Sequence, residues 1–183
     1  MENVMKIKTI ALPALIALSL SACDTYTAQQ YQSSAANTIS LQQLAARGER
    51  ATVGEVILAE GIQPRPTCRL AGPLDLGGGD NLAETIKQAI QTELLAGGVY
   101  KPGATPININ VVALTPDSMN GKWTIGLQVY STRSSGFTVQ SVTEFSTSFS
   151  AVAACGNTAT AFNRALSAAI NMMVSDPRFA QLI

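Results

Sequence analysis

The side chains best able to carry out chemistry are few in this chain and are spread along its length. The 183 residues include no histidine, which removes the commonest general base and a usual ligand of catalytic zinc. Carboxylate pairs and Ser-Lys arrangements remain as catalytic alternatives, but the acidic residues show no spacing typical of such sites. We therefore interpret them as caps, turn residues and solvated surface, and we expect no enzyme activity, no metal and no cofactor. The acidic residues concerned are Asp24, Glu49, Glu55, Glu60, Asp75, Asp80, Glu84, Glu93, Asp117, Glu144 and Asp176.

Residues 1–22 have the layout of an export signal. An apolar stretch from Ile10 to Leu20 follows Lys6 and Lys8 and leads into small residues. A short basic region, an apolar core of about 7–15 residues and small residues at a cleavage point are the parts of such a signal. The segment is too short to cross a bilayer as a helix. The plainer alternative is an ordinary secretory signal that has a cysteine nearby.

The run Leu20-Ser21-Ala22-Cys23 resembles a bacterial lipobox. The resemblance implies that the peptide is cut before Cys23, that the Cys23 thiol carries a diacylglycerol, and that the new amino group is usually acylated. Because each buried methylene contributes about 0.8 kcal/mol, two or three acyl chains hold a protein durably on a membrane. The next residue, Asp24, resembles the signal that keeps lipoproteins in the inner membrane of enteric bacteria. We therefore expect a lipid anchor on the periplasmic side, with the inner membrane favoured over the outer membrane.

The other two cysteines, Cys68 and Cys155, are expected to pair. The chain has three cysteines in all, and with Cys23 bound to lipid these two would share an oxidising compartment in which thiols tend to form disulfides. The bridge would close a loop of roughly ninety residues, for which the chain-entropy model gives about 4–5 kcal/mol of stabilisation as an upper figure. Two buried free thiols are the alternative.

Length and charge favour a single domain that does not bind nucleic acid. Removing residues 1–22 leaves 161 residues, an ordinary length for one domain with a substantial core. This part has ten basic and eleven acidic side chains. Surfaces that bind nucleic acid or anionic lipid need clustered positive charge, and so we expect neither.

The mature chain is predicted to begin with a tether. Residues 24 to about 38 are rich in Thr, Gln, Ser and Ala and are too polar to bury a core. Ser40 can then cap a short helix that stops at Gly48. We therefore expect a lipidated cysteine with a flexible tether over residues 23–49 and a periplasmic α+β domain over residues 50–183.

The first half of that domain is predicted to hold one strand and one helix. Residues 51–59 favour a strand, and because their apolar residues fall on both faces we expect it to be covered on both sides or at one end. Residues 61–79 are rich in Pro and Gly and predict a loop. Glycines 77–79 could cradle an anion, although a turn is the simpler interpretation because no Lys follows at P-loop spacing.

After Asn81, apolar residues at helical spacing predict an amphipathic helix that ends at Gly97-Gly98. These apolar residues are Leu82, Ile86, Ala89, Ile90 and Leu94.

Three runs of alternating apolar and polar residues come next. They cover residues 107–111 and 123–129 and a third stretch from Phe137 through Phe149, which we expect to continue to about Ala153. The turns between them are short enough for antiparallel neighbours. Each strand is therefore expected to have one buried and one wet face.

A second amphipathic helix closes the domain. It is predicted to begin at Asn157 or Thr158 and to stop at Asp176-Pro177, after which a final turn places Phe179 and Leu182 on the core. The order β-α-β-β-β-α then predicts an α+β fold. Its simplest form is a two-layer sandwich, with a mostly antiparallel sheet of about four strands packed on two helices.

This element order, with a lipobox in front and Asp176-Pro177-Arg178-Phe179 behind, resembles small envelope lipoproteins of the YajG type. More distantly it resembles the lipoprotein subunit of the lipopolysaccharide export machine. The likeness spans about residues 50–183 as a pattern and carries no functional residues with it. It implies a non-enzymatic protein, and our first hypothesis is an interaction or assembly component of the cell envelope.

The second hypothesis is a protein that binds a lipid or another amphiphile. Met172, Met173, Phe145 and Phe149 would then line an apolar cavity between sheet and helices, although ordinary core positions are the plainer interpretation of all four. A cavity of several hundred Å³ would favour binding of such a ligand. A filled core with an exposed apolar strand edge would favour a protein partner.

Overall fold

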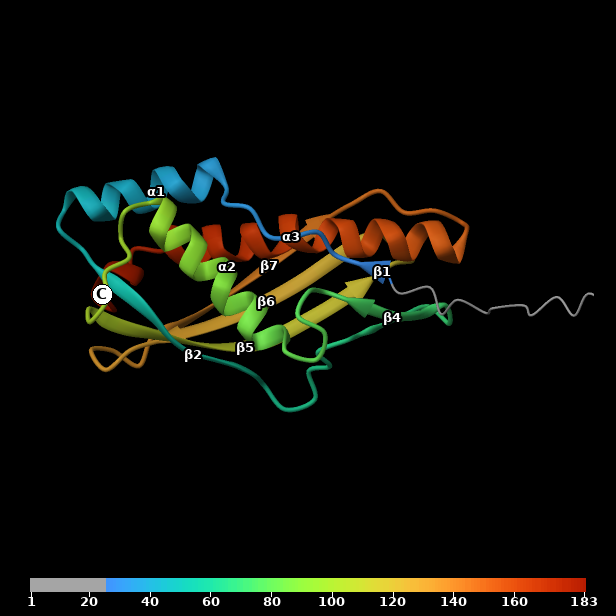
Figure 1. The fold of residues 1–183 in the computed structure, drawn as a ribbon, viewed down its shortest axis with the longest axis horizontal. Coiled ribbons are helices and arrows are strands. Elements are labelled where there is room, and N and C mark those ends of the chain that lie inside the picture. The colour runs from blue at the N-terminus through green and yellow to red at the C-terminus, as the bar shows by residue number, and fades with distance from the viewer. Residues whose placement is uncertain (1–25) are drawn as a thin grey trace, which may run out of the picture.

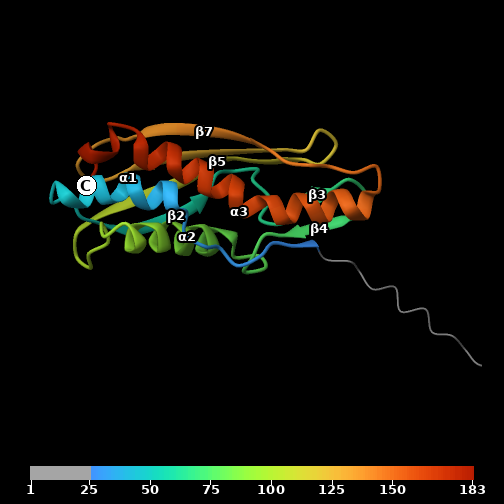
Figure 2. The ribbon, with the colours of Figure 1, turned by 90° about the horizontal axis from the view of Figure 1, so that it is seen from above.

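The computed structural model describes residues 26–183. The predicted export signal, the lipidation site Cys23 and the sorting residue Asp24 lie outside the described residues. The described part contains three α-helices, a 3-10 turn and two sheets, one of four strands and one of three. Figures 1 and 2 show that the smaller sheet lies at one end of the long axis, whereas the C-terminus lies at the other.

The larger sheet carries the predicted fold. Its strands lie in the order β2-β5-β6-β7, with β2 parallel to β5 and the other neighbours antiparallel. Helix α2 contacts β2, and helix α3 contacts β6 and β7. The predicted α+β sandwich is therefore confirmed. The elements are β2 (Ala51–Leu58), α2 (Leu82–Ala96), β5 (Thr105–Asp117), β6 (Lys122–Tyr130), β7 (Phe137–Glu144) and α3 (Ala151–Ser175).

The core lies between this sheet and the helices, and Trp123 fixes its centre. The Trp123 side chain is fully buried, and its ring centroid lies 5.5 Å from that of Phe162 on α3. Its indole nitrogen donates a hydrogen bond of 2.9 Å to the backbone carbonyl of Thr158. A buried indole needs such a partner, because an unpaired polar group in the core is costly. These two contacts fix the position of α3 along strand β6.

A β-bulge explains why strand β2 has apolar residues on both faces. Val53 pairs with Ile107 but Val56 pairs with Ile109, so one extra residue is inserted in β2. The insertion changes which face the later side chains reach, and both valines are buried. The expectation that β2 is covered on both sides or at one end is therefore wrong.

The residues between β2 and α2 form more than the predicted loop. They include β3 (Thr67–Cys68) and β4 (Gly72–Asp75), which form a hairpin, and β1 (Tyr26–Thr27) pairs in parallel with β4. Strands this short carry little periodic signal, and Pro and Gly are the residues that mark turns in a sequence. A disulfide and cross-strand contacts, instead of local propensity, hold this three-stranded sheet together.

The segment before β2 is also part of the folded domain. Helix α1 spans Ala35–Ala46 and packs against α2 and α3, with Leu41 and Leu44 buried. Tyr26 is buried too. The predicted short helix is confirmed and ends before Gly48, but it begins at Ala35 and is not capped by Ser40. The prediction of a flexible tether over residues 23–49 is wrong for its described part, because a few apolar side chains and buried polar contacts are enough to order a polar segment against a preformed surface.

Helix α3 begins earlier than predicted, and β7 ends earlier. Ser150 caps the helix by accepting a hydrogen bond from the backbone N–H of Ala153, and Ala151 to Ala154 favour a helix strongly. The strand stops at Glu144, not at about Ala153, because the apparent alternation through Phe149 continues into a loop. The predicted final turn is confirmed, since Phe179 and Leu182 are fully buried.

Candidate functional site

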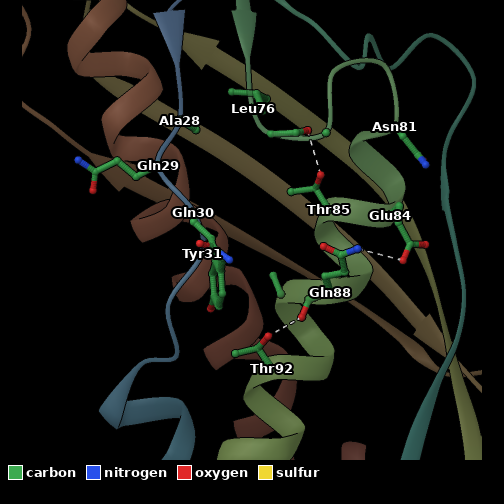
Figure 3. Close-up of a pocket in the computed structure, with 13 residues that line it drawn as sticks. Ala28, Gln29, Gln30, Tyr31, Leu76, Asn81, Glu84, Thr85, Gln88 and Thr92 are labelled. Atoms are coloured by element: carbon green, nitrogen blue, oxygen red, sulfur yellow. Dashed lines mark hydrogen bonds between the residues drawn. The ribbon is translucent and has the colours of Figure 1, made fainter.

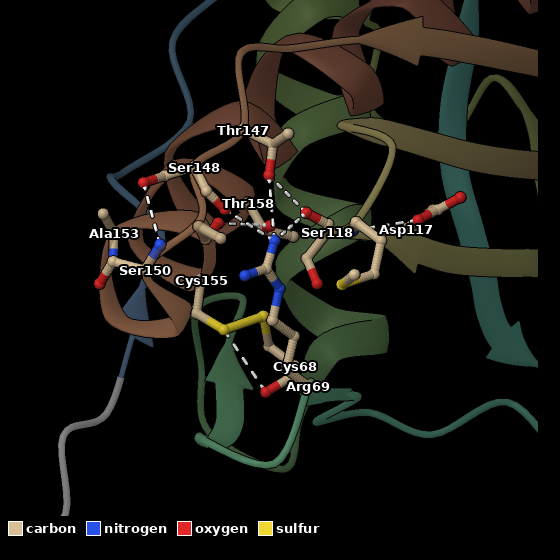
Figure 4. Close-up of a disulfide and its surroundings, with 12 residues drawn as sticks. Cys68, Arg69, Asp117, Ser118, Thr147, Ser148, Ser150, Ala153, Cys155 and Thr158 are labelled. Carbon is tan, nitrogen blue, oxygen red and sulfur yellow. Dashed lines mark hydrogen bonds between the residues drawn. A yellow bond between two sulfur atoms is a disulfide. The ribbon is translucent and has the colours of Figure 1, made fainter.

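The small sheet is fastened to α3 by the predicted disulfide. Cys68 at the end of β3 is bonded to Cys155 in the early part of α3, with 5.7 Å between their Cα atoms and both residues buried (Figure 4). Such a Cα separation is normal for a disulfide. The bridge joins two segments that are 87 residues apart, and it fixes the position of the β3-β4 turn relative to the rest of the domain.

Arg69, at the start of that turn, binds the neighbouring loops. Its guanidinium donates hydrogen bonds to the backbone carbonyls of Ser118 and Ser148, both at 2.9 Å, and to that of Phe149 at 3.2 Å (Figure 4). Its backbone has a φ of 48°, a left-handed conformation that is uncommon for a residue other than glycine. The β3-β4 turn, the β5-β6 turn and the loop before α3 are thus tied to one side chain.

Large apolar side chains protrude from the loops that Arg69 joins. Leu70 is 104% and Phe149 107% exposed, and Met119 is 68% exposed. Phe149 and Met119 border a shallow hollow of about 300 Å³ beside Arg69. We call these three residues, with the half-exposed Val152 of α3, the apolar tip. No pattern in the sequence indicates it, because exposure of Phe149 depends on where β7 ends.

The four residues that could have lined an apolar cavity do not come together. Met173 lies in the core with no exposed surface, whereas Met172, on the same helix, is 45% exposed. Phe145 packs against the core at its margin and Phe149 belongs to the apolar tip. The expected common cavity is therefore not formed by these residues.

A hollow lies between the N-terminal segment and α2. Its volume is about 500 Å³, and its walls carry mainly amide and hydroxyl side chains (Figure 3). Several of these groups already have partners nearby, since Thr85 donates to the carbonyl of Gly77 at 2.9 Å and Thr92 to that of Gln88 at 2.8 Å. The groove suits a neutral polar group and offers no cation to an anionic one, because Glu84 is the charged residue among those lining it.

Glycines 77–79 at the edge of this groove form a turn, as the simpler interpretation predicts. The amide of Gly77 donates to the carboxylate of Asp75 at 3.0 Å, and the carbonyl of Gly78 accepts from the amide of Asn81 at 3.1 Å. The backbone N–H of Gly77 is thus already bound to the Asp75 carboxylate and is not available to bind an anion. The arrangement does not form the anion cradle that three glycines before a helix could have provided.

A buried carboxylate joins four segments of the chain. Glu93 of α2 has no exposed surface, and its Oε1 accepts hydrogen bonds from the Tyr31 hydroxyl at 2.6 Å, the Ser34 amide at 3.0 Å and the Asn37 amide group at 2.9 Å. Asn37 also donates to the carbonyl of Ser167 on α3 at 3.2 Å. These residues form what we call the Glu93 cluster. It ties the N-terminal segment and α1 to α2 and α3.

The prediction that Glu93 lies on solvated surface is wrong. The position falls on the apolar stripe of α2, three residues after Ile90 and seven after Ile86, so helical spacing alone marks it as inward-facing. The pKa of the Tyr31 phenol is raised well above its usual range. Burial is the larger cause, and the hydrogen bond to Glu93 is the second. Tyr31 therefore stays a hydrogen-bond donor at all ordinary pH values.

Two kinds of feature are absent from residues 26–183. This part of the chain holds no group of three or more His, Cys, Asp or Glu side chains placed to bind a metal ion. Within the same residues no helix has both the length and the apolarity needed to cross a membrane. Comparisons with protein-family models, with curated proteins and with solved structures find no match to this chain.

Proposed function

We propose that this chain is a lipid-anchored periplasmic protein that binds other components of the cell envelope and does not act as an enzyme. The observation that carries the proposal is the lipobox-like run ending at Cys23, three residues before the first ordered strand. An acyl anchor at Cys23 would leave almost no free chain between membrane and domain. The domain would then work at the membrane surface, not at the end of a long tether.

The Cys68-Cys155 disulfide supports an exported protein. Disulfides persist in oxidising compartments and are rare in the reducing cytosol. A bridge that closes a loop of this length contributes about 4–5 kcal/mol at most in the chain-entropy model, a large share of the roughly 5–15 kcal/mol typical of a domain. A chain that depends on such a bridge is suited to the periplasm.

An assembly role is supported by the free edge of the main sheet. Strand β7 pairs only with β6 among the described strands, so its outer edge can accept a further strand. Val142 of β7 is 58% exposed. The outward positions before it, Thr138 and Gln140, carry no charge, and the charged Glu144 stands at the end of the strand, paired with Lys122. An edge with charge only at one end offers backbone hydrogen bonds to an extended segment of a partner.

The anchor is tested by mass spectrometry of the protein isolated from bacterial membranes. A mature chain that begins at Cys23 and carries a diacylglycerol is expected, and Cys23→Ser should accumulate as an uncut precursor or as a soluble species cut by another peptidase. Ser33→Ala, a substitution in the exposed part of the N-terminal segment, is the matched control and should be processed normally. An unmodified Cys23 at the mature N-terminus would refute the proposed anchor.

The partner-binding edge is tested with a photo-crosslinking amino acid at position 142 in living cells. A discrete crosslinked envelope protein is expected there, and a probe at Met172, a similarly exposed residue of α3, serves as control. Equal, diffuse crosslinking at both positions would show that β7 is not the partner surface. With the probe kept at position 142, Gln140→Lys on the same exposed face of β7 should remove the specific product while leaving thermal stability unchanged.

A further inference from the structure

The two most exposed apolar side chains of the described surface, Leu70 and Phe149, lie on loops that Arg69 joins. Leu70 and Phe149 both have fully exposed side chains, whereas the other large apolar side chains on the surface are at most 68% exposed. Single exposed apolar residues are common on soluble proteins, but a group of them marks an interaction surface. We therefore expect the apolar tip to be buried against a partner or a membrane, and its place in the fold indicates which of these it contacts.

The apolar tip and the N-terminal end of β1 lie at the same end of the molecule. Strand β4 leads away from the turn that carries Leu70, and β1 runs parallel to β4, with Tyr26 opposite Leu74. The N-terminal end of β1 therefore points toward the same end of the molecule as that turn, as Figures 1 and 2 show. Because one residue spans at most about 3.6 Å, the Cα atom of Cys23 lies within roughly 11 Å of that of Tyr26.

The tip is also held rigid before anything binds to it. The disulfide fixes the residue before Arg69, and three carbonyl groups fix the Arg69 guanidinium. Leu70 and Phe149 consequently protrude from loops that are already ordered, so that little conformational freedom is lost when they are buried. A surface that is ordered in advance in this way is suited to permanent contact with a single apolar environment.

We propose that the apolar tip is a membrane-docking surface, which inserts Leu70 and Phe149 into the acyl-chain boundary of the same bilayer that holds the lipid anchor. The inference rests on the proposed anchoring at Cys23. A lipid chain supplies one attachment point and leaves the domain free to rotate about it, whereas the tip supplies a second. The two together would hold the long axis at a fixed angle and present the β7 edge to the periplasm.

The test uses tryptophan as a depth probe in the full chain, processed by the cell and reconstituted in vesicles of zwitterionic lipid with brominated acyl chains. Leu70→Trp and Phe149→Trp are the probes. Leu95→Trp is the matched control, because Leu95 is a 55% exposed apolar residue at the end of α2, remote from the tip. The native Trp123 is fully buried and gives the same background in each variant.

Docking predicts that the added fluorescence of the Leu70→Trp and Phe149→Trp variants is mostly lost to bromine quenching, while that of Leu95→Trp is retained. Equal quenching in all three variants would overturn the inference. So would a dimer in detergent solution that dissociates on Leu70→Ser and Phe149→Ser, because the tip would then cover a second copy of the chain. Circular dichroism of each variant confirms that the exposed substitutions leave the fold intact.

Mass spectrometry of the same preparation separates this inference from the proposed function. If Cys23 carries acyl chains and the tip probes are not quenched, the docking surface is refuted and the anchor stands. If Cys23 is unmodified, the anchor is refuted, and quenching on simple addition of vesicles decides the docking surface alone. Quenching of the Phe149→Trp variant but not of Leu95→Trp under those conditions would still support it, and its absence would refute it.

Discussion

The Tyr31 hydroxyl lies 2.6 Å from a carboxylate oxygen of Glu93 and donates a hydrogen bond to it. Sixty-two residues separate the two positions, and no cation is among the hydrogen-bond partners of this carboxylate in the described structure. The contact thus serves as a buried fastening that joins the N-terminal segment to α2. A force applied at Cys23 would load the β1-β4 pairing first and the Glu93 cluster after it.

Removal of the Tyr31 hydroxyl should weaken the whole domain. Hydrogen bonds to charged groups contribute about 1.5–3 kcal/mol, and a carboxylate left with fewer donors in a buried site is costly. We expect Tyr31→Phe to lower the free energy of unfolding by about that amount in urea titrations. Tyr130→Phe, for which no hydrogen bond of the hydroxyl is found in the described structure, is the comparison and should have a smaller effect.

The same tyrosine should make stability depend on alkaline pH. Its pKa in the folded state is raised above the value of 10.0 for a free phenol, by burial first and then by Glu93. The unfolded chain therefore loses its proton first, and the stability contributed by neutral Tyr31 is complete below about pH 10 and falls as the pH rises further. Thermal unfolding measured between about pH 8 and pH 11 should show this decline, and Tyr31→Phe should reduce its slope.

Loss of the Cys68-Cys155 bridge should be the largest single destabilisation. Cys155→Ser is expected to lower the free energy of unfolding by up to about 4–5 kcal/mol. A reducing agent should lower the melting temperature of the wild type and leave that of a Cys68→Ala, Cys155→Ala double variant unchanged. An equal effect of reductant on both proteins would contradict the assignment of the effect to the bridge.

The bulge in β2 should make Gly54 intolerant of substitution. A Cβ atom at this position would lie 2.3 Å from Oδ1 of Asn108, the atom that accepts a 2.9 Å hydrogen bond from the Glu55 amide. Gly54→Ala should therefore cost about 1–3 kcal/mol of stability. Gly156→Ala is the matched control, because Gly156 lies in α3 with no atom within 4 Å of the added methyl group, and a gain of about 0.5–1 kcal/mol is expected there.

The sorting hypothesis predicts a change of membrane. If Asp24 retains the protein in the inner membrane, Asp24→Ser should move it to the outer-membrane fraction of a density gradient. The physical reason is that a carboxylate beside the lipid head group can alter how the sorting machinery grips the anchor. Wild-type protein already in the outer-membrane fraction, or no relocation of the variant, would show that Asp24 is simply a polar residue of the N-terminal segment.

Elements with strong internal periodicity could be predicted from the sequence. The stripe from Leu82 to Leu94 predicts α2, and the alternation around Ile109 and Ile125 predicts two strands of the main sheet. The disulfide followed from the number of cysteines and the expected compartment. In each case a local pattern or a count is sufficient, because every residue involved points to the same structure.

Features that depend on tertiary contacts could not be predicted in this way. The polar composition around α1 suggests a tether, but the burial of Asn37 and Leu41 depends on the surface formed by α2 and α3. The bulge in β2 depends on Asn108, which belongs to a neighbouring strand. The apolar tip depends on two tertiary features. Strand β7 ends at Glu144, and three loops are held together by Arg69.

The Cys68-Cys155 bridge also has a consequence for the order in which the chain acquires its structure. The covalent ring that it closes contains α2 and the complete β5-β6-β7 meander. The meander pairs strands that are neighbours in sequence, which is fast, whereas β2 can join β5 only after α2 has returned the chain across the sheet. Cys155 can meet Cys68 only when the start of α3 lies beside the small sheet, and we therefore expect oxidation to follow, not to direct, the packing of α3.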